Sequence, residues 1–140
     1  MVDDVVLNKT ATIERCLARV REEHAGDDRN LYHDLTKQDS VVLNLQRACE
    51  AAIDLAMHLV AVRRLGLPQE SREAFDLLRD AGIIDPQLAD RLKAMVGFRN
   101  VAVHDYQRLN LDVVRAIVAT RLDDFPAFTR AALQARGEAR

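Results

Sequence analysis

The sequence predicts an all-α protein, an antiparallel bundle of four or five helices. Apolar residues recur at a spacing close to 3.6 along most of the chain, as expected of helices with one buried face. No segment alternates apolar and polar residues over the length of a convincing strand. With 140 residues and no internal repeat, the chain is expected to form a single domain over residues 1–140, with a tail that frays from about residue 135.

The first helix is expected at about residues 4–23. Its apolar residues form one stripe, and its charged residues lie elsewhere: the stripe comprises Val6, Ile13, Leu17 and Val20. The polar segment 24–30 is typical of a turn, and residues 31–37 fit either a loop or an early start of the next helix.

The second helix is expected to be the longest element, about 25 residues that end near Leu65. Asp39 or Ser40 could cap it, because a short oxygen-bearing side chain accepts hydrogen bonds from the free amides of the first turn. Gly66 suits a left-handed terminal residue, and Pro68 prevents the helix from continuing.

A short third helix fits residues 71–81, with Ser71 as its cap and Gly82 as its stop. Asp85 and Pro86 give the clearest start signal, since Asp caps and Pro is tolerated at the first helical position. Gly97 lies within the fourth helix and indicates a close backbone approach there. The residues of this fourth helix that are expected to face inward are Leu88, Leu92, Met95 and Val96.

Asn110 or Asp112 is expected to open the last helix. Pro126 lies within the continuation of this helix and predicts a kink or break near Asp124. A further turn or more should follow, from Pro126 to about Gln134.

The composition is that of a globular protein, with 49% apolar and 30% charged residues and no apolar run near the length of a membrane span. The acidic segment 1–4 lacks the basic and apolar parts of a signal peptide, so a cytoplasmic protein without membrane association is expected. The net charge of −2 argues against a broad nucleic-acid-binding surface but leaves room for a local basic cleft. Cys16 and Cys49 show no clustered pattern and are expected in the core as free thiols.

Side chains suited to phosphate chemistry concentrate in residues 99–106, which read Arg-Asn-Val-Ala-Val-His-Asp-Tyr. Arg99 supplies a permanent cation with a forked set of donors, and His104 a group that exchanges a proton near neutral pH. Asn100 and His104 are neighbours on one helix face, whereas Arg99 lies about 140° from His104 around the axis and is long enough to reach toward it.

This set of side chains is what an attack on a phosphodiester without a metal ion or cofactor would need. RNA carries its own nucleophile, the 2′-hydroxyl, so Arg99 would clamp the phosphate and His104 would act as acid, base or phosphate-orienting group. Asn100 would position one of these two side chains or a phosphate oxygen. No compact His/Cys/carboxylate set that would bind a metal occurs in the sequence. In the alternative interpretation, Arg99 pairs with Asp105 or a carboxylate of the second helix, and His104 merely stabilises a helix end.

Residues 95–106 closely resemble the signature of HEPN-domain ribonuclease toxins, and within them the HepT (DUF86) group. The motif of that group is Arg, a polar residue, three residues, His, any residue and Tyr. Arg99, Asn100, His104 and Tyr106 match it position by position. The resemblance extends through residues 46–54, 75–78 and 82–86 and covers roughly residues 5–125.

The resemblance implies a HEPN-like, metal-independent endoribonuclease, the toxin of a type VII HepT/MntA-like toxin–antitoxin system. It implies a homodimer with two motifs across a shared cleft, RNA as substrate, and a minimal nucleotidyltransferase antitoxin of the MntA type as partner. That antitoxin would add AMP to Tyr106, placing anionic phosphate beside Arg99 and His104. Tyr106 could instead be a core or interface aromatic with its hydroxyl paired. The alternative function is a non-catalytic helical module that binds a nucleotidyltransferase or a nucleotide.

The other ionisable residues give weaker signals. Glu50 and Asp54 share one helix face and are expected to pair with Arg47, His58 or an arginine of a partner chain rather than to bind a metal. His58 follows an apolar run and is expected to be a hydrogen-bonded interior or interface histidine. Another histidine, His33, lies in the segment 31–37, which fits either a loop or a helix, and we assign it no role.

Overall fold

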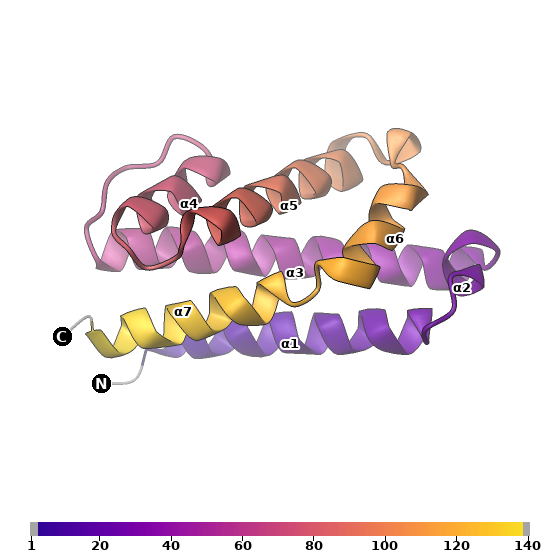
Figure 1. Cartoon of the computed structure of the whole chain (residues 1–140), viewed down its shortest axis with the longest axis horizontal. Coiled ribbons are helices and arrows are strands. Elements are labelled where there is room, and N and C mark those ends of the chain that lie inside the picture. Colours follow the sequence, from indigo (N-terminus) through magenta and orange to yellow (C-terminus); the bar gives the residue numbers. More distant parts are fainter. Residues whose placement is uncertain (1–2, 139–140) are drawn as a thin grey trace.

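The computed structural model describes residues 3–138, and helices account for most of them (Figure 1). No strand occurs in this part of the chain, so the predicted all-α fold is confirmed. The elements follow in the order α1 (Asp4–His24), α2 (Arg29–Tyr32), α3 (Leu35–Val62), α4 (Ser71–Asp80), α5 (Pro86–His104), the 3-10 turn η1 (Tyr106–Arg108), α6 (Leu111–Thr120) and α7 (Asp124–Glu138). The described residues thus form seven α-helices rather than four or five, because residues 29–32 make one helical turn and the last pattern divides into two helices.

The two long helices α1 and α3 lie side by side along the molecule (Figure 1). α5 packs against α3, α4 lies against α3 and α5, and α7 contacts α1, α3 and α5. The start of α1 and the end of α7 lie at the same end of the bundle, and α5 finishes toward the opposite end (Figure 1). The segment after α5 therefore lies far from both ends of the described chain.

α3 begins four residues earlier than the nearest predicted cap. The side chain of Asp34 caps it by accepting from the backbone amide of Lys37 at 3.0 Å. The prediction of Asp39 or Ser40 as the cap is wrong, because both lie inside the helix. α3 spans 28 residues and is the longest element of the described chain, as predicted.

α3 ends at Val62, three residues before the predicted end near Leu65. The left-handed residue after it is Arg64, at φ 53°, whereas Gly66 has φ 148°. The prediction of Gly66 as the left-handed terminal residue is therefore wrong, since the chain has already turned two residues earlier.

The start of α5 is confirmed to the residue. Asp85 accepts from the backbone amide of Leu88 at 2.7 Å, and Pro86 occupies the first turn. The predicted cap of α4 is wrong: Ser71 is its first helical residue, and Glu70 takes the cap position without a side-chain hydrogen bond. The close approach predicted at Gly97 is made by a side chain instead of a backbone, because a Cβ there would lie 2.9 Å from Arg72 Nη2.

The break predicted in the last helix is also confirmed. Asn110 caps α6 by accepting from the backbone amide of Asp112 at 2.8 Å, and α6 ends at Thr120. α7 begins at Asp124, so Pro126 lies in its first turn, where a missing N–H removes no helical bond.

α7 is longer than predicted. It continues to Glu138, and Ala135 is buried, so the predicted end near residue 134 is wrong. Residues 139–140 of the predicted tail lie outside the described residues.

One apolar core joins all seven α-helices of the described chain. The largest fully buried side chains include Phe75 of α4 and Phe125 and Phe128 of α7, and the rings of Phe75 and Phe128 meet edge to face at 5.5 Å. Cys16 and Cys49 are buried free thiols, as predicted. All eight residues predicted to face inward from α1 and α5 are buried: Val6, Ile13, Leu17, Val20, Leu88, Leu92, Met95 and Val96. Within residues 3–138, no helix combines the length and apolarity that a membrane span requires.

Candidate functional site

The motif lies where α5 ends and the chain turns. Arg99 and Asn100 belong to the last turns of the helix, and His104 is its final residue. Asp105 then leaves helical geometry at φ −150° and ψ 51°, and Tyr106 opens the 3-10 turn η1. The motif therefore divides between a rigid helix end and the short turn that follows it.

Arg99 is half-buried, and its Nε is one of the few buried side-chain nitrogen or oxygen atoms of the described chain without a hydrogen-bond partner. Its side chain comes close to α3: burial raises the pKa of the Cys49 thiol to about 12, and the Arg99 charge opposes that shift. Among residues 3–138, Asp105 pairs with Arg108 at 3.4 Å and no carboxylate pairs with Arg99. The alternative interpretation, in which an ion pair within the chain occupies Arg99, is therefore wrong.

The direction of the Arg99 side chain follows from its position in α5. Leu92, Met95 and Ala102 are buried, and their spacing from Arg99 puts all four residues on the stripe that faces the core. The sequence carried this signal, because an arginine that interrupts an apolar stripe at helical spacing must reach the edge of the core. Helix periodicity thus explains why the guanidinium is half-buried.

Asn100 and His104 lie on the exposed part of α5. In the described chain, the His104 ring makes no hydrogen bond or ion pair, and it sits at the helix C-terminus, where the backbone dipole favours a cation. The side chains of Arg99, Asn100 and His104 make no hydrogen bond with one another among residues 3–138. Within a single chain, the motif therefore offers a half-buried cation and an exposed imidazole on different sides of one helix.

Tyr106 is 44% exposed, which excludes a position inside the core of this chain. Its hydroxyl donates to Asp39 Oδ1 on α3 at 2.8 Å. Burial of the hydroxyl and the Asp39 carboxylate raise the pKa of Tyr106 to about 12. No local pattern in the sequence indicates this contact, since 67 residues separate the two side chains and Asp39 stands out only as a possible helix cap.

A groove between α1 and α3 lies beside this tyrosine and includes Asp39 in its lining. Four cations line it, Lys9, Arg15, Arg19 and Arg47, together with the carboxylates of Asp39, Glu50 and Asp54. The groove is thus mixed in charge, with a small excess of positive groups.

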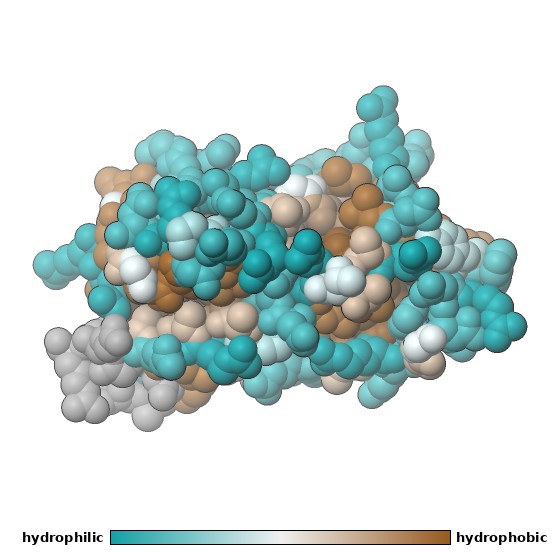
Figure 2. Space-filling view, viewed as in Figure 1, coloured by the Kyte–Doolittle hydropathy of each residue, from teal (hydrophilic) through white to brown (hydrophobic). Residues whose placement is uncertain are grey.

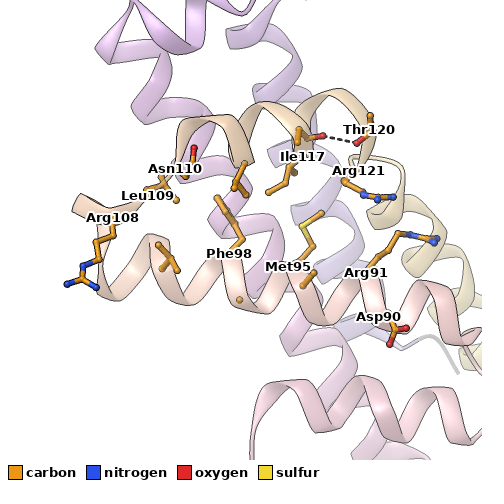
Figure 3. Close-up of a pocket in the computed structure, with 15 residues that line it drawn as sticks. Asp90, Arg91, Met95, Phe98, Arg108, Leu109, Asn110, Ile117, Thr120 and Arg121 are labelled. Carbon is orange, nitrogen blue, oxygen red and sulfur yellow. Dashed lines mark hydrogen bonds between the residues drawn. The ribbon is translucent and has the colours of Figure 1, made fainter.

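A second, mainly apolar cavity of about 620 Å³ lies between α5 and α6 (Figure 3). Met95, Phe98 and Ile117 point into it, and apolar residues are visible there on the surface (Figure 2). Arg99, Asn100, His104 and Tyr106 are all absent from its lining. No side chain of the motif therefore contributes to this cavity.

The comparison with protein families decides the assignment. A family model described as ribonuclease HepT-like matches residues 13–132. The chain belongs to the HepT-like family. The resemblance seen in the sequence, and with it the prediction that the chain is an enzyme of the ribonuclease class, is confirmed at the level of the family.

Two curated HepT-like proteins are similar in sequence. The mRNA nuclease HepT of Shewanella oneidensis is 50% identical over 127 residues, which cover 91% of this chain and 95% of that protein. The tRNA nuclease HepT of Aphanizomenon flos-aquae is 30% identical over 86 residues, which cover 61% of this chain and 58% of that protein.

Two solved HepT-like structures share the fold. One is the tri-AMPylated Shewanella oneidensis HEPN toxin in complex with an MNT antitoxin, with a TM-score of 0.90 and 48% identity over 95% of this chain and 99% of that chain. The other is a toxin–antitoxin complex with AMP-PNP, with a TM-score of 0.90 and 48% identity over 94% of this chain and 99% of that chain. The predicted HEPN-like helical bundle is confirmed by these likenesses.

Three other ionisable residues singled out in the sequence, Glu50, Asp54 and His58, have partners within the chain. Asp54 pairs with Lys9 at 3.1 Å, and Glu50 accepts from Gln46 at 3.4 Å, so the predicted pairing of these carboxylates with Arg47 or His58 is wrong within the chain. Half-buried His58 pairs with Asp3 at 2.8 Å, as expected of a hydrogen-bonded histidine. In residues 3–138, no group of three or more His, Cys, Asp or Glu side chains is arranged to hold a metal ion.

Proposed function

We propose that this HepT-like chain is an endoribonuclease toxin that cleaves RNA without a metal ion, through Arg99, Asn100 and His104. The observation that carries the proposal is the state of two side chains at one helix end. The Arg99 guanidinium has no ion-pair partner within the described chain, and the His104 imidazole is exposed and unpartnered. Both groups are therefore available to a ligand, in a motif that matches the family position by position.

In the proposed reaction, the 2′-hydroxyl of a ribose attacks the adjacent phosphorus. The 2′-oxygen–phosphorus bond forms, the phosphorus–5′-oxygen bond breaks, and the products end in a 2′,3′-cyclic phosphate and a 5′-hydroxyl. An imidazole can take the proton from the 2′-hydroxyl or supply one to the leaving oxygen, which is the role of His104. Arg99 stabilises the negative charge that grows on the phosphate, and Asn100 orients the phosphate or the imidazole.

Cleavage of a fluorescent RNA should proceed in excess EDTA at the rate seen without chelator. The products should carry 2′,3′-cyclic phosphate and 5′-hydroxyl ends, detectable by phosphatase and kinase treatment before electrophoresis. Loss of cleavage in EDTA with recovery on adding Mg²⁺ would overturn the metal-independent mechanism. If the wild-type chain cuts no RNA but still binds a nucleotide or the nucleotidyltransferase, the ribonuclease proposal is wrong and the chain is a non-catalytic binding module.

We propose further that two copies of the chain form the active cleft. One chain offers a single arginine and a single histidine on different sides of α5. The motif of a second copy would supply the further side chains needed to bind the phosphate. One apolar side chain of the same helix end, Val103, is 41% exposed and would be covered by the partner copy.

Size-exclusion chromatography with light scattering should therefore give the mass of a dimer at micromolar concentration. Val103→Asp should shift the chain toward the monomer and reduce cleavage in parallel. The exposed Leu67, 88% accessible and far from the motif in sequence, provides the matched control, so Leu67→Asp should leave the mass unchanged. A wild-type chain that stays monomeric yet cleaves at full rate would exclude the shared cleft.

We propose that the partner of this chain is a minimal nucleotidyltransferase antitoxin that adds AMP to Tyr106. Three observations support this proposal: Tyr106 is exposed, it lies two residues from His104, and similar HepT-like toxins occur AMPylated or in complex with an MNT antitoxin. AMP on Tyr106 would bring an anionic phosphate to the helix end that Arg99 and His104 occupy, where it would compete with RNA. The single-domain and cytoplasmic assignments made from the sequence stay predictions.

A further inference from the structure

A hydrogen bond links the tyrosine of the motif, Tyr106, to a carboxylate of α3, Asp39. The Tyr106 hydroxyl donates to Asp39 Oδ1 at 2.8 Å, from the turn after α5 to the first turns of α3. Asp39 is not needed as a helix cap, because Asp34 caps α3. Among residues 3–138, this tyrosine is the only hydrogen-bond partner of the Asp39 carboxylate.

The protonation state of Tyr106 gives this contact a chemical consequence. With a pKa raised to about 12, the phenol keeps its proton at neutral pH and is a poor nucleophile. Any reaction that attaches a phosphoryl group to its oxygen must therefore remove that proton. The carboxylate that already accepts the hydrogen bond is the group best placed to receive it.

We propose that Asp39 positions the Tyr106 hydroxyl and accepts its proton when the antitoxin transfers AMP, an inference that rests on the function proposed above. In this step, the Tyr106 oxygen attacks the α-phosphorus of a nucleoside triphosphate. The oxygen–phosphorus bond forms, the bond from the α-phosphorus to the bridging oxygen breaks, and pyrophosphate leaves with that electron pair. The phenolic proton passes to the Asp39 carboxylate.

The chain contains a matched control for this pair. Its only other tyrosine, Tyr32, also donates its hydroxyl to a carboxylate, that of Asp112 on α6. This second tyrosine–aspartate pair lies outside the motif and joins α2 to α6. Replacing either aspartate with asparagine removes the same carboxylate charge from a tyrosine contact, but only the change at Asp39 should alter the transfer of AMP.

The experiment measures the rate of AMP addition to Tyr106. Full-length wild-type chain, Asp39→Asn, Asp39→Glu and Asp112→Asn are each incubated with the cognate minimal nucleotidyltransferase, ATP and Mg²⁺. Intact mass gives the rate, and peptide mapping distinguishes Tyr106 from Tyr32. Asn keeps an oxygen that can accept a hydrogen bond but loses the basicity, so Asp39→Asn separates proton transfer from positioning.

We expect Asp39→Asn to lower kcat by about 10²-fold, the lower end of the range for general bases, with little change in the KM for ATP. Asp39→Glu should restore part of this loss, and Asp112→Asn should stay within about twofold of the wild-type rate. Wild-type rates in Asp39→Asn, or equal losses in Asp39→Asn and Asp112→Asn, overturn the role of Asp39. If the wild-type chain itself gains no AMP at Tyr106, both the proposed modification and the role of Asp39 are wrong. The wild-type reaction alone shows this outcome, so it is distinguished from a failure of the Asp39 inference only.

Discussion

RNA cleavage by the His104→Ala variant is expected to be slower than wild type by roughly 10²–10⁴-fold, the usual contribution of a general acid or base. The imidazole is the group of the motif that can exchange a proton, and alanine removes it without replacement. Because the His104 side chain is exposed and has no partner in the described chain, its loss should change the free energy of unfolding by less than about 0.5 kcal/mol. Single-turnover cleavage of a labelled RNA and urea unfolding measure the two effects.

The matched control for this variant is His33→Ala. His33 is also exposed, but it follows the short helix α2 and lies outside the motif. The His33→Ala variant should cleave RNA at the wild-type rate and unfold at the wild-type urea concentration. Equal activity in the two variants would remove His104 from the reaction, and a large loss of stability in His104→Ala would make its lost activity uninformative.

Arg99→Met is expected to separate activity from stability. Methionine matches the length of the arginine stem, fills irregular space at the edge of the core, and leaves no donor behind. The wild-type chain carries the cost of a buried Nε–H without a partner, about 1–3 kcal/mol for such a group. The free energy of unfolding should therefore stay the same or rise by about 1 kcal/mol, while cleavage falls by at least about 10²-fold, as when a donor to a developing oxyanion is removed.

The opposite pattern is expected for a half-buried arginine that has carboxylate partners. Arg79 pairs with Asp76 at 3.1 Å and with Asp80 at 3.0 Å on α4. Arg79→Met should lower the free energy of unfolding slightly and leave cleavage unchanged. If Arg99→Met instead destabilises the chain by more than this control and cleavage survives, the guanidinium has a structural role.

Local signals in the sequence predicted most of the fold. Apolar periodicity located the long helices, and Asp85 with Pro86 marked the start of α5 to the residue, because capping and the fixed backbone of proline act over three or four residues. The cap of α3 was missed because residues 31–37 carry no periodic pattern, so Asp34 did not stand out from the polar segment before it.

The candidate site, like the fold, could be predicted where local patterns determine it but not where it depends on distant contacts. The four motif residues follow from a local pattern and a family resemblance, and the burial of Arg99 could have been read from its place on the apolar stripe of α5. The contact between Tyr106 and Asp39 could not, because it depends on how two helices distant in sequence pack against each other. The chemistry of the side chains indicates an attack on a phosphodiester, but RNA as the substrate follows from the resemblance, since a net charge of −2 gives no indication of a nucleic-acid substrate.

The position of the two described chain ends has a practical consequence. α1 starts and α7 finishes at one end of the bundle, while the helix that carries Arg99 and His104 finishes toward the other (Figure 1). A purification tag or a fluorescent label fused at either terminus would extend away from the motif. The protein could thus be anchored to a sensor surface through either terminus while the opposite tip remains open to a long transcript.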